Sequence, residues 1–185
     1  MRKNFGTKSW FYPLPVLIIG TYDENDIPDA MNAAWGGLYD ADKVVLCLSA
    51  GHKTTRNIKA KGAFTVSFAD AEHVVPADYV GLVSANSESK KMERSGLHST
   101  KSAFVDAPLF DELPVTLECT FLRETEEGNI IGQIVNVCID ESVLDADGEL
   151  DLGKFHPISF EPVHNGYHMM GERVGNAFQD GSVLK

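Results

Sequence analysis

The sequence predicts a single, mainly β domain in which antiparallel strands form a barrel with two or three peripheral helices. Roughly seven or eight short runs are rich in β-branched or alternating apolar residues. Two of these runs, residues 114–125 and 130–143, indicate a long hairpin, whose length suits a barrel better than a flat open sheet. A chain of 185 residues that is 43% hydrophobic can bury one full core, and no break in composition divides it.

The first predicted hairpin begins near the N-terminus. Residues 15–22 are rich in β-branched side chains, and the polar cluster 23–26 that follows predicts a turn. The return strand, residues 27–37, is made of unusually small residues, so a ligand or another backbone can approach it closely. The next predicted elements are a strand at 43–49, a helix that ends near Lys61 and a strand at 63–68.

The later part of the chain adds short helices and strands. Helices are predicted within residues 74–83 and 87–94, with Gly96 as the stop of the second. Short strands are predicted at 157–162 and 166–170. We expect the polar, glycine-containing residues 172–181 to pack on a neighbour or to fray.

The charge balance narrows the class of partner. The chain has 16 basic and 27 acidic residues and a formal net charge of −11, which disfavours a nucleic-acid function. The basic start is not followed by a long apolar segment, since residues 15–20 are too few for a signal sequence or a membrane span. We therefore expect a cytoplasmic protein.

Metal-binding and thiol chemistry are not predicted. Cys47, Cys119 and Cys138 are widely spaced in apolar runs and are expected to be small core residues in a reducing compartment. His164 and His168 stand four apart, but the residues between them indicate a turn joined to a strand rather than one helix face. The alternating carboxylates of residues 145–151 lack the calcium-loop spacing and predict a polar hairpin turn instead.

A basic segment is the main candidate site. Residues 49–62 carry four basic side chains and no acid, and they follow a strand and open a helix. Backbone N–H groups at a helix N-terminus favour an anion. The groups that could converge on it are the N–H groups of residues 51–55, the hydroxyls of Ser49, Thr54 and Thr55, and the Lys53 ammonium. The alternative is an ordinary helix start capped by Thr54 or Thr55.

Three motifs in order give the chain a family resemblance. They are Pro13-Leu-Pro-Val-Leu-Ile-Ile-Gly-Thr-Tyr-Asp, Asn32-Ala-Ala-Trp-Gly-Gly and Leu48-Ser-Ala-Gly-His-Lys-Thr-Thr-Arg-Asn-Ile, and Asp78-Tyr-Val-Gly81 follows. With the central hairpin, they resemble the flavin reductase-like family, and within it the flavoredoxin type, over about residues 10–165. The resemblance implies a Greek-key-like, FMN-binding split β-barrel that forms a homodimer, with the flavin at or near the subunit interface.

The resemblance also implies a cofactor site. The residues expected at the FMN phosphate are Ser49, His52, Lys53, Thr54 and Thr55. Those expected near the ribityl chain and the flavin ring are Asn32, Ala33, Ala34 and Trp35, although Trp35 could instead be a core residue. Asp78 and Ser84 are expected to contact the flavin or a nicotinamide, or else to cap a helix. Arg56 faces either the phosphate or solvent.

The implied function is redox chemistry carried by the cofactor. The first hypothesis is an FMN-dependent oxidoreductase that takes hydride from NAD(P)H and passes electrons to free flavin or another acceptor. No catalytic side chain is assigned, because the cofactor supplies the chemistry, and His52 is expected to donate a hydrogen bond rather than act as a base. The alternative is an electron carrier in which bound FMN serves protein redox partners. A more distant alternative is a ligand-binding barrel without redox turnover.

Overall fold

The computed structural model describes residues 1–185 and confirms the mainly antiparallel β fold. The main sheet has seven strands in the order β3-β2-β6-β9-β10-β5-β4, and every pair in it is antiparallel. These strands are β2 (Leu17–Tyr22), β3 (Pro28–Ala33), β4 (Gly36–Asp40), β5 (Lys43–Leu46), β6 (Ala63–Phe68), β9 (Val115–Glu124) and β10 (Ile130–Ile139). The predicted long hairpin is β9 with β10, at the centre of this sheet.

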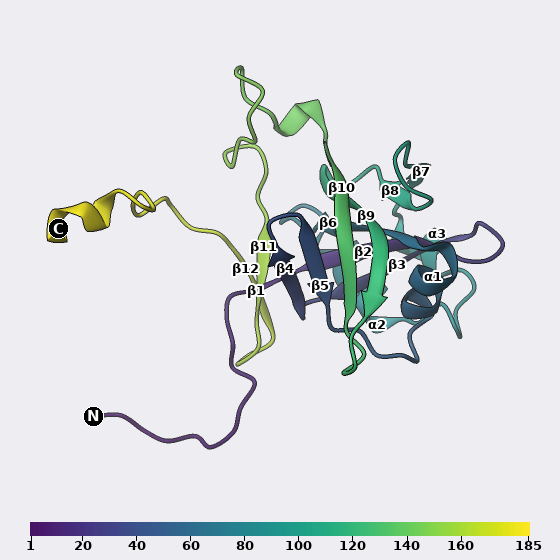
Figure 1. Ribbon diagram of the computed structural model, residues 1–185, viewed down its shortest axis with the longest axis horizontal. Coiled ribbons are helices and arrows are strands. Elements are labelled where there is room, and N and C mark those ends of the chain that lie inside the picture. The colour runs from purple at the N-terminus through teal and green to yellow at the C-terminus, as the bar shows by residue number, and fades with distance from the viewer.

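Three helices lie beside one end of the sheet, as Figure 1 shows. They are α1 (Lys53–Lys61), α2 (Val74–Leu82) and α3 (Lys91–Ser95). α1 ends at Gly62, which adopts φ +68° and donates its N–H to the carbonyl of Ile58 at 2.8 Å. α3 ends at Gly96 with φ +73°, as the sequence predicted.

Smaller elements complete the fold. β1 (Leu14–Pro15), β11 (Ile158–Glu161) and β12 (Gly166–Met169) form a second sheet, and β7 (Ser99–Lys101) pairs with β8 (Pro108–Phe110). Two 3-10 helices are η1 (Glu141–Val143) and η2 (Asp180–Leu184). β1, β7 and β8 were not predicted, because strands of two or three residues carry no readable alternation.

One predicted strand is wrong. Residues 27–37 form two strands, since β3 ends at Ala33 beside β2 and β4 begins at Gly36 beside β5. A Cβ at Gly36 would lie 2.9 Å from Leu46 Cδ2 and 3.1 Å from Leu17 Cδ1. Glycine therefore lets the chain pass closely over the core between the two strands.

β2 divides two apolar cores and fixes the helices against the sheet. All six residues of β2 are buried. Leu17 and Ile19 belong to a cluster that includes Ile58 of α1, whereas Ile18 belongs to a cluster that includes Val80 of α2. Because α1 and α2 each insert an apolar side chain into a core, both are held beside β2 and β3.

Several predictions about individual segments can be judged. The turn at 145–151 is confirmed, since Asp145 Oδ1 accepts the N–H groups of Asp147 and Glu149. No cluster of His, Cys, Asp or Glu side chains could hold a metal ion. None of the helices has the length and apolar character that a membrane span requires.

Cys119 is buried as predicted, and burial together with the nearby Glu118 carboxylate raises the pKa of its thiol to about 12. Cys47 is exposed, so that core prediction is wrong, because Val44, Leu46 and Leu48 face the core and Cys47 falls on the opposite side of this alternation.

Candidate functional site

A pocket of about 230 Å³ opens at the start of α1. It lies between this helix start, β3, the end of α2 and the loop that follows α2. Five of the predicted site residues line it, namely Asn32, His52, Lys53, Thr54 and Ser84. The other lining residues are Asp29, Met31, Val80, Gly81, Leu82, Val83, Ala85 and Lys91.

The start of α1 is uncapped. His52 occupies the cap position with extended backbone, and its side chain makes no capping hydrogen bond. The first turn contains no acidic residue, so nothing on the helix offsets the positive end of its dipole. The predicted alternative of a cap by Thr54 or Thr55 is therefore wrong. His52 Nδ1 is buried and has no hydrogen-bond partner, which is unusual for a buried polar atom.

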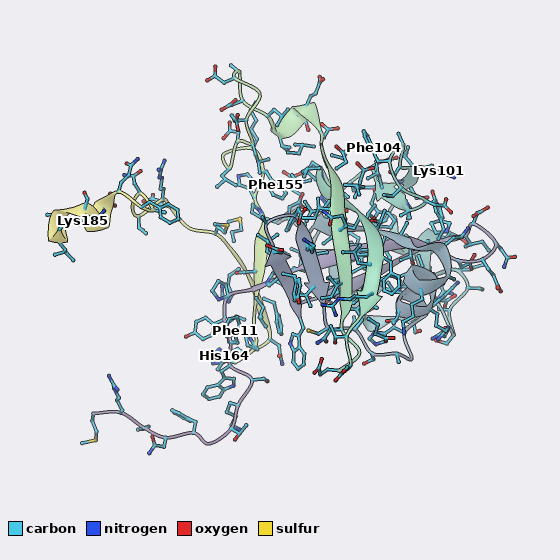
Figure 2. The ribbon with its side chains drawn as sticks, viewed as in Figure 1. Phe11, Lys101, Phe104, Phe155, His164 and Lys185 are labelled. Carbon is cyan, nitrogen blue, oxygen red and sulfur yellow. The ribbon has the colours of Figure 1, made fainter.

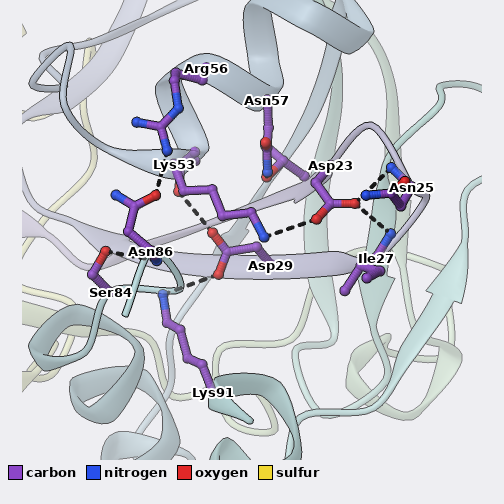
Figure 3. A network of polar contacts seen from close by, with 12 residues as sticks. Asp23, Asn25, Ile27, Asp29, Lys53, Arg56, Asn57, Ser84, Asn86 and Lys91 are labelled. Carbon is purple, nitrogen blue, oxygen red and sulfur yellow. Dashed lines mark hydrogen bonds and ion pairs between the residues drawn. The ribbon is translucent and has the colours of Figure 1, made fainter. Parts of the chain in front are cut away.

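Lys53 is held by the turn between β2 and β3. Its ammonium lies 2.9 Å from Asp23 Oδ2, and both side chains are largely buried (Figure 3). Asp23 Oδ1 also accepts the N–H groups of Asn25 and Ile27. Burial opposes ionisation of this carboxyl, but the hydrogen bond from Lys53 and those two N–H groups outweigh it and lower the pKa of Asp23. Lys53 thus reaches the pocket as a cation that already has an anionic partner.

A second ion pair forms the buried wall of the pocket. Asp29 is 1% exposed and Lys91 is 3% exposed. The Lys91 ammonium lies 3.2 Å from Asp29 Oδ1, and Thr54 Oγ1 lies 3.4 Å from Asp29 Oδ2. The sequence analysis missed both charged residues. The signal for Asp29 was a carboxylate inside a strand of small apolar residues, where a buried charge requires a partner.

Asn32 connects β3 to α2. Its side-chain Nδ2 donates to the carbonyl of Ala77 at 2.9 Å, so the expected partner for this amide exists. Asp78 lies next to this contact and accepts a hydrogen bond from Tyr167 Oη at 2.8 Å. Burial and the Asp78 carboxylate raise the pKa of Tyr167 to about 12. Asp78 lies inside α2, so the helix-cap alternative is wrong for it.

Ser84 and Arg56 organise the loop beyond α2. Ser84 Oγ accepts the N–H of Asn86 at 3.2 Å, a local turn contact, while Ser84 also lines the pocket. Arg56 donates to the carbonyl of Gly51 at 3.0 Å and to Asn86 Oδ1. Arg56 therefore ties the loop to the start of α1 (Figure 3).

The remaining predicted residues do not line this pocket. Thr55 is buried and donates its hydroxyl to the carbonyl of Ser49 at 2.9 Å, which shapes the approach to α1. Ala33 lies in the apolar core, and Ala34 is half-buried. Trp35 is 60% exposed, so the core alternative for Trp35 is wrong. Its side chain stands on the surface just before β4.

The pocket has the chemistry of an anion site with polar neighbours. It combines two ammonium groups, an uncapped helix start, a buried ring nitrogen without a partner and the side-chain hydroxyls of Thr54 and Ser84. Asp29 is the carboxylate among the lining residues. These groups can bind and orient a ligand.

Comparison with known proteins agrees with this fold. The family described as flavin reductase like domain matches residues 9–159. The structure of flavoredoxin from Desulfovibrio vulgaris (Miyazaki F) superposes with a TM-score of 0.93 at 36% identity, covering 98% of this chain and 100% of that chain. Flavoredoxin from Methanosarcina acetivorans superposes with a TM-score of 0.90 at 25% identity, with both chains fully covered.

A more distant structure shares the fold. The FMN-binding domain of a flavin reductases-like enzyme from Shewanella baltica OS155 superposes with a TM-score of 0.78 at 18% identity, covering 88% of each chain. No curated protein matches. The family match covers most of the chain and the 36% identical structure covers nearly all of it, so the chain is a split-barrel protein of the flavin reductase-like family, of the flavoredoxin type.

Proposed function

We propose that this protein binds FMN through the pocket at the start of α1 and is an oxidoreductase that uses NAD(P)H. Bound FMN would accept hydride from the nicotinamide and release electrons to free flavin or another acceptor. The observation that carries the proposal is the uncapped start of α1, where His52 Nδ1 is buried without a partner beside two ammonium groups. The unpaired N–H groups of a helix start, together with neighbouring ammonium groups, fit a phosphate.

The residues of the pocket would bind and orient the cofactor. Lys53, Lys91 and the first N–H groups of α1 would hold the phosphate, with the Thr54 hydroxyl as a further donor. The amide of Asn32, fixed by the Ala77 carbonyl, would orient the ribityl chain beside β3. We assign these groups binding and orienting roles, because each forms hydrogen bonds and none is assigned a proton transfer.

The pocket holds only one end of a flavin. Pockets that enclose a cofactor-sized ligand measure about 300–1,000 Å³, whereas this one measures about 230 Å³. The flavin ring must therefore extend beyond it. Apolar side chains are exposed at Trp35, which follows the end of β3, and at Leu38 and Tyr39 of β4, with exposed fractions of 60%, 73% and 52%.

We therefore propose that a second copy of this chain completes the site as a homodimer. Residues 1–13 and 168–185 are exposed throughout, and both segments leave the body of the molecule in Figure 1. Figure 2 shows that most of the C-terminal segment, as far as Lys185, has open space beside its side chains. Segments rich in apolar residues that contact little of their own chain suit an interface between subunits.

Two experiments test these proposals. The visible spectrum of the purified protein with FMN, followed by anaerobic addition of NADH or NADPH, should show bound flavin and then loss of its absorbance. A protein that does not bind FMN would refute the cofactor assignment. Light scattering should give a dimer, and Leu38→Glu should shift it toward monomer with weaker FMN binding. A wild-type monomer that binds FMN fully would refute the dimer.

The second candidate function is an electron carrier with bound FMN and protein redox partners. The 36% identical structure, which is called a flavoredoxin, favours this alternative. The two functions differ in one measurement. Bound FMN that is not reduced by either nicotinamide, but is reduced by an electron-transfer protein, would favour the carrier over the NAD(P)H-dependent oxidoreductase.

A further inference from the structure

Two walls of the pocket are joined to each other by side chains that lie outside it. One wall is the start of α1, residues 52–54, and the other is the loop after α2, residues 83–85. Gly51 directly precedes the first of these segments, and Asn86 directly follows the second. Asn86 Nδ2 donates to the Gly51 carbonyl at 3.3 Å. The two walls are therefore closed against each other at this point.

Arg56 completes the link, which we call the Arg56–Asn86 bridge and which consists of Gly51, Arg56 and Asn86. The Arg56 guanidinium donates to the Gly51 carbonyl at 3.0 Å and also to Asn86 Oδ1. All three residues are exposed, and none of them lines the pocket. Figure 3 shows the side chains of Arg56 and Asn86 pointing toward each other, one from α1 and one from the loop. The bridge thus lies on the outer side of the residues that line the pocket.

The loop holds Asn86 in place for this bridge. Ser84 Oγ accepts the N–H of Asn86 at 3.2 Å, and the Ser84 carbonyl accepts the N–H groups of Ser87 and Glu88, both at 3.0 Å. These contacts fold residues 84–88 into a compact turn. Because the turn already fixes the backbone of Asn86, only its side chain loses conformational entropy when it bonds to Gly51 and Arg56.

The bridge stands where two flavins differ. FMN ends in a phosphate monoester, whereas in FAD the same phosphate is linked through a second phosphate to adenosine. The pocket measures about 230 Å³, so it has no room for the adenylyl group in addition to the phosphate end of the flavin. In the proposed function the ribityl chain runs beside β3, and the adenylyl group of FAD needs a different way out of the pocket.

We propose that the Arg56–Asn86 bridge makes the site specific for FMN over FAD, because the adenylyl group would leave the pocket between α1 and the loop, where the bridge closes it. This inference rests on the proposed function and adds to it the residues that choose between the two flavins. FMN binds while the bridge is closed. FAD binds only when the bridge opens and its three hydrogen bonds are lost, and this cost falls on the unwanted ligand alone.

Calorimetric titration with FMN and with FAD measures the specificity as the ratio of the FAD Kd to the FMN Kd. Asn86→Ala removes two of the three hydrogen bonds and leaves the charge of the site unchanged. The double variant Arg56→Ala, Asn86→Ala removes the whole bridge. The wild type should bind FMN more tightly than FAD, and the ratio should fall about tenfold in the double variant, the size expected for a few exposed hydrogen bonds. Asn86→Ala alone should give a smaller fall.

Arg94→Ala is the matched control. Arg94 is also an exposed arginine that bonds to this loop, through Glu88 Oε2 at 2.6 Å, but neither Arg94 nor Glu88 lines the pocket. The ratio should not change in this control. A fall in Arg94→Ala as large as that in the double variant would overturn the inference, because a general loosening of the loop would then explain both.

The outcomes separate the inference from the proposed function. Wild-type protein that binds neither flavin would refute the function itself. Wild type that binds FAD as tightly as FMN, or a folded double variant in which both affinities fall equally or stay constant, would refute only the role of the bridge. If circular dichroism shows that the double variant does not fold, Asn86→Ala decides, and an unchanged ratio in it refutes the proposal.

Discussion

Gly81→Ala tests whether close packing between α2 and β3 shapes the pocket. A Cβ at Gly81 would lie 2.9 Å from Asn32 Cβ. Carbon atoms in good contact are about 3.5–4.0 Å apart, so α2 and β3 must separate locally by about 0.6–1.1 Å. Because Gly81 and Asn32 both line the pocket, this separation should change the ligand's surroundings without adding a group that binds it.

The expected change in the free energy of unfolding of Gly81→Ala is the sum of two opposing effects. Alanine in place of glycine stabilises a helix by about 1 kcal/mol, while an overpacked contact costs about 1–3 kcal/mol. The free energy of unfolding should therefore fall by about 0–2 kcal/mol. We expect FMN affinity to fall about tenfold, or about 1.4 kcal/mol, because the Asn32 amide would be displaced from its position.

Urea unfolding and FMN titration measure both quantities. Gly37→Ala on β4 is a suitable control, since a Cβ there meets no atom within 4 Å. This control should leave the free energy of unfolding nearly unchanged. The reasoning would be refuted if Gly81→Ala were more stable than wild type by about 1 kcal/mol and bound FMN normally, because the contact with Asn32 would then cost nothing.

Three further predictions concern the same region. Lys53→Ala should weaken FMN binding by about 1.5–3 kcal/mol but spare riboflavin, as titration would show, and equal losses for both would contradict a phosphate contact. The folded state lowers the pKa of Asp23 below its unfolded value of about 3.9. The ionised Asp23 therefore adds its full contribution to the free energy of unfolding above about pH 3.9, and this contribution is lost as the pH falls through the folded pKa. Urea unfolding of Asp23→Asn should accordingly show a shallower loss of stability in acid than wild type, and parallel curves would argue against the Lys53 pair. Ile58→Ala should lower the free energy of unfolding by about 2–5 kcal/mol, because this side chain is fully buried under α1; a loss below about 0.5 kcal/mol would show that α1 is not anchored there.

Local patterns were sufficient to predict most of the fold. The alternating residues of β9 and β10 and the helix that ends at Gly62 were all located from the sequence. These features depend on neighbours a few residues away, which is the range that hydrophobic periodicity and glycine conformation report. Strand partners are set by contacts across the core, which explains why residues 27–37 were predicted as one strand although they pair with both β2 and β5.

The sequence likewise predicted one part of the candidate site, and the tertiary structure was needed for the other. The sequence by itself indicated an anion site at the basic segment, because uncompensated positive charge at a helix start is a local property. Only the tertiary structure placed Lys91 against Ala30, which lies 61 residues away, and set Asp29 between Lys91 and Thr54. It also turned the Thr55 hydroxyl toward the Ser49 carbonyl. Burial and long-range packing decide which charges meet in a pocket, and neither can be read from the order of residues along one segment.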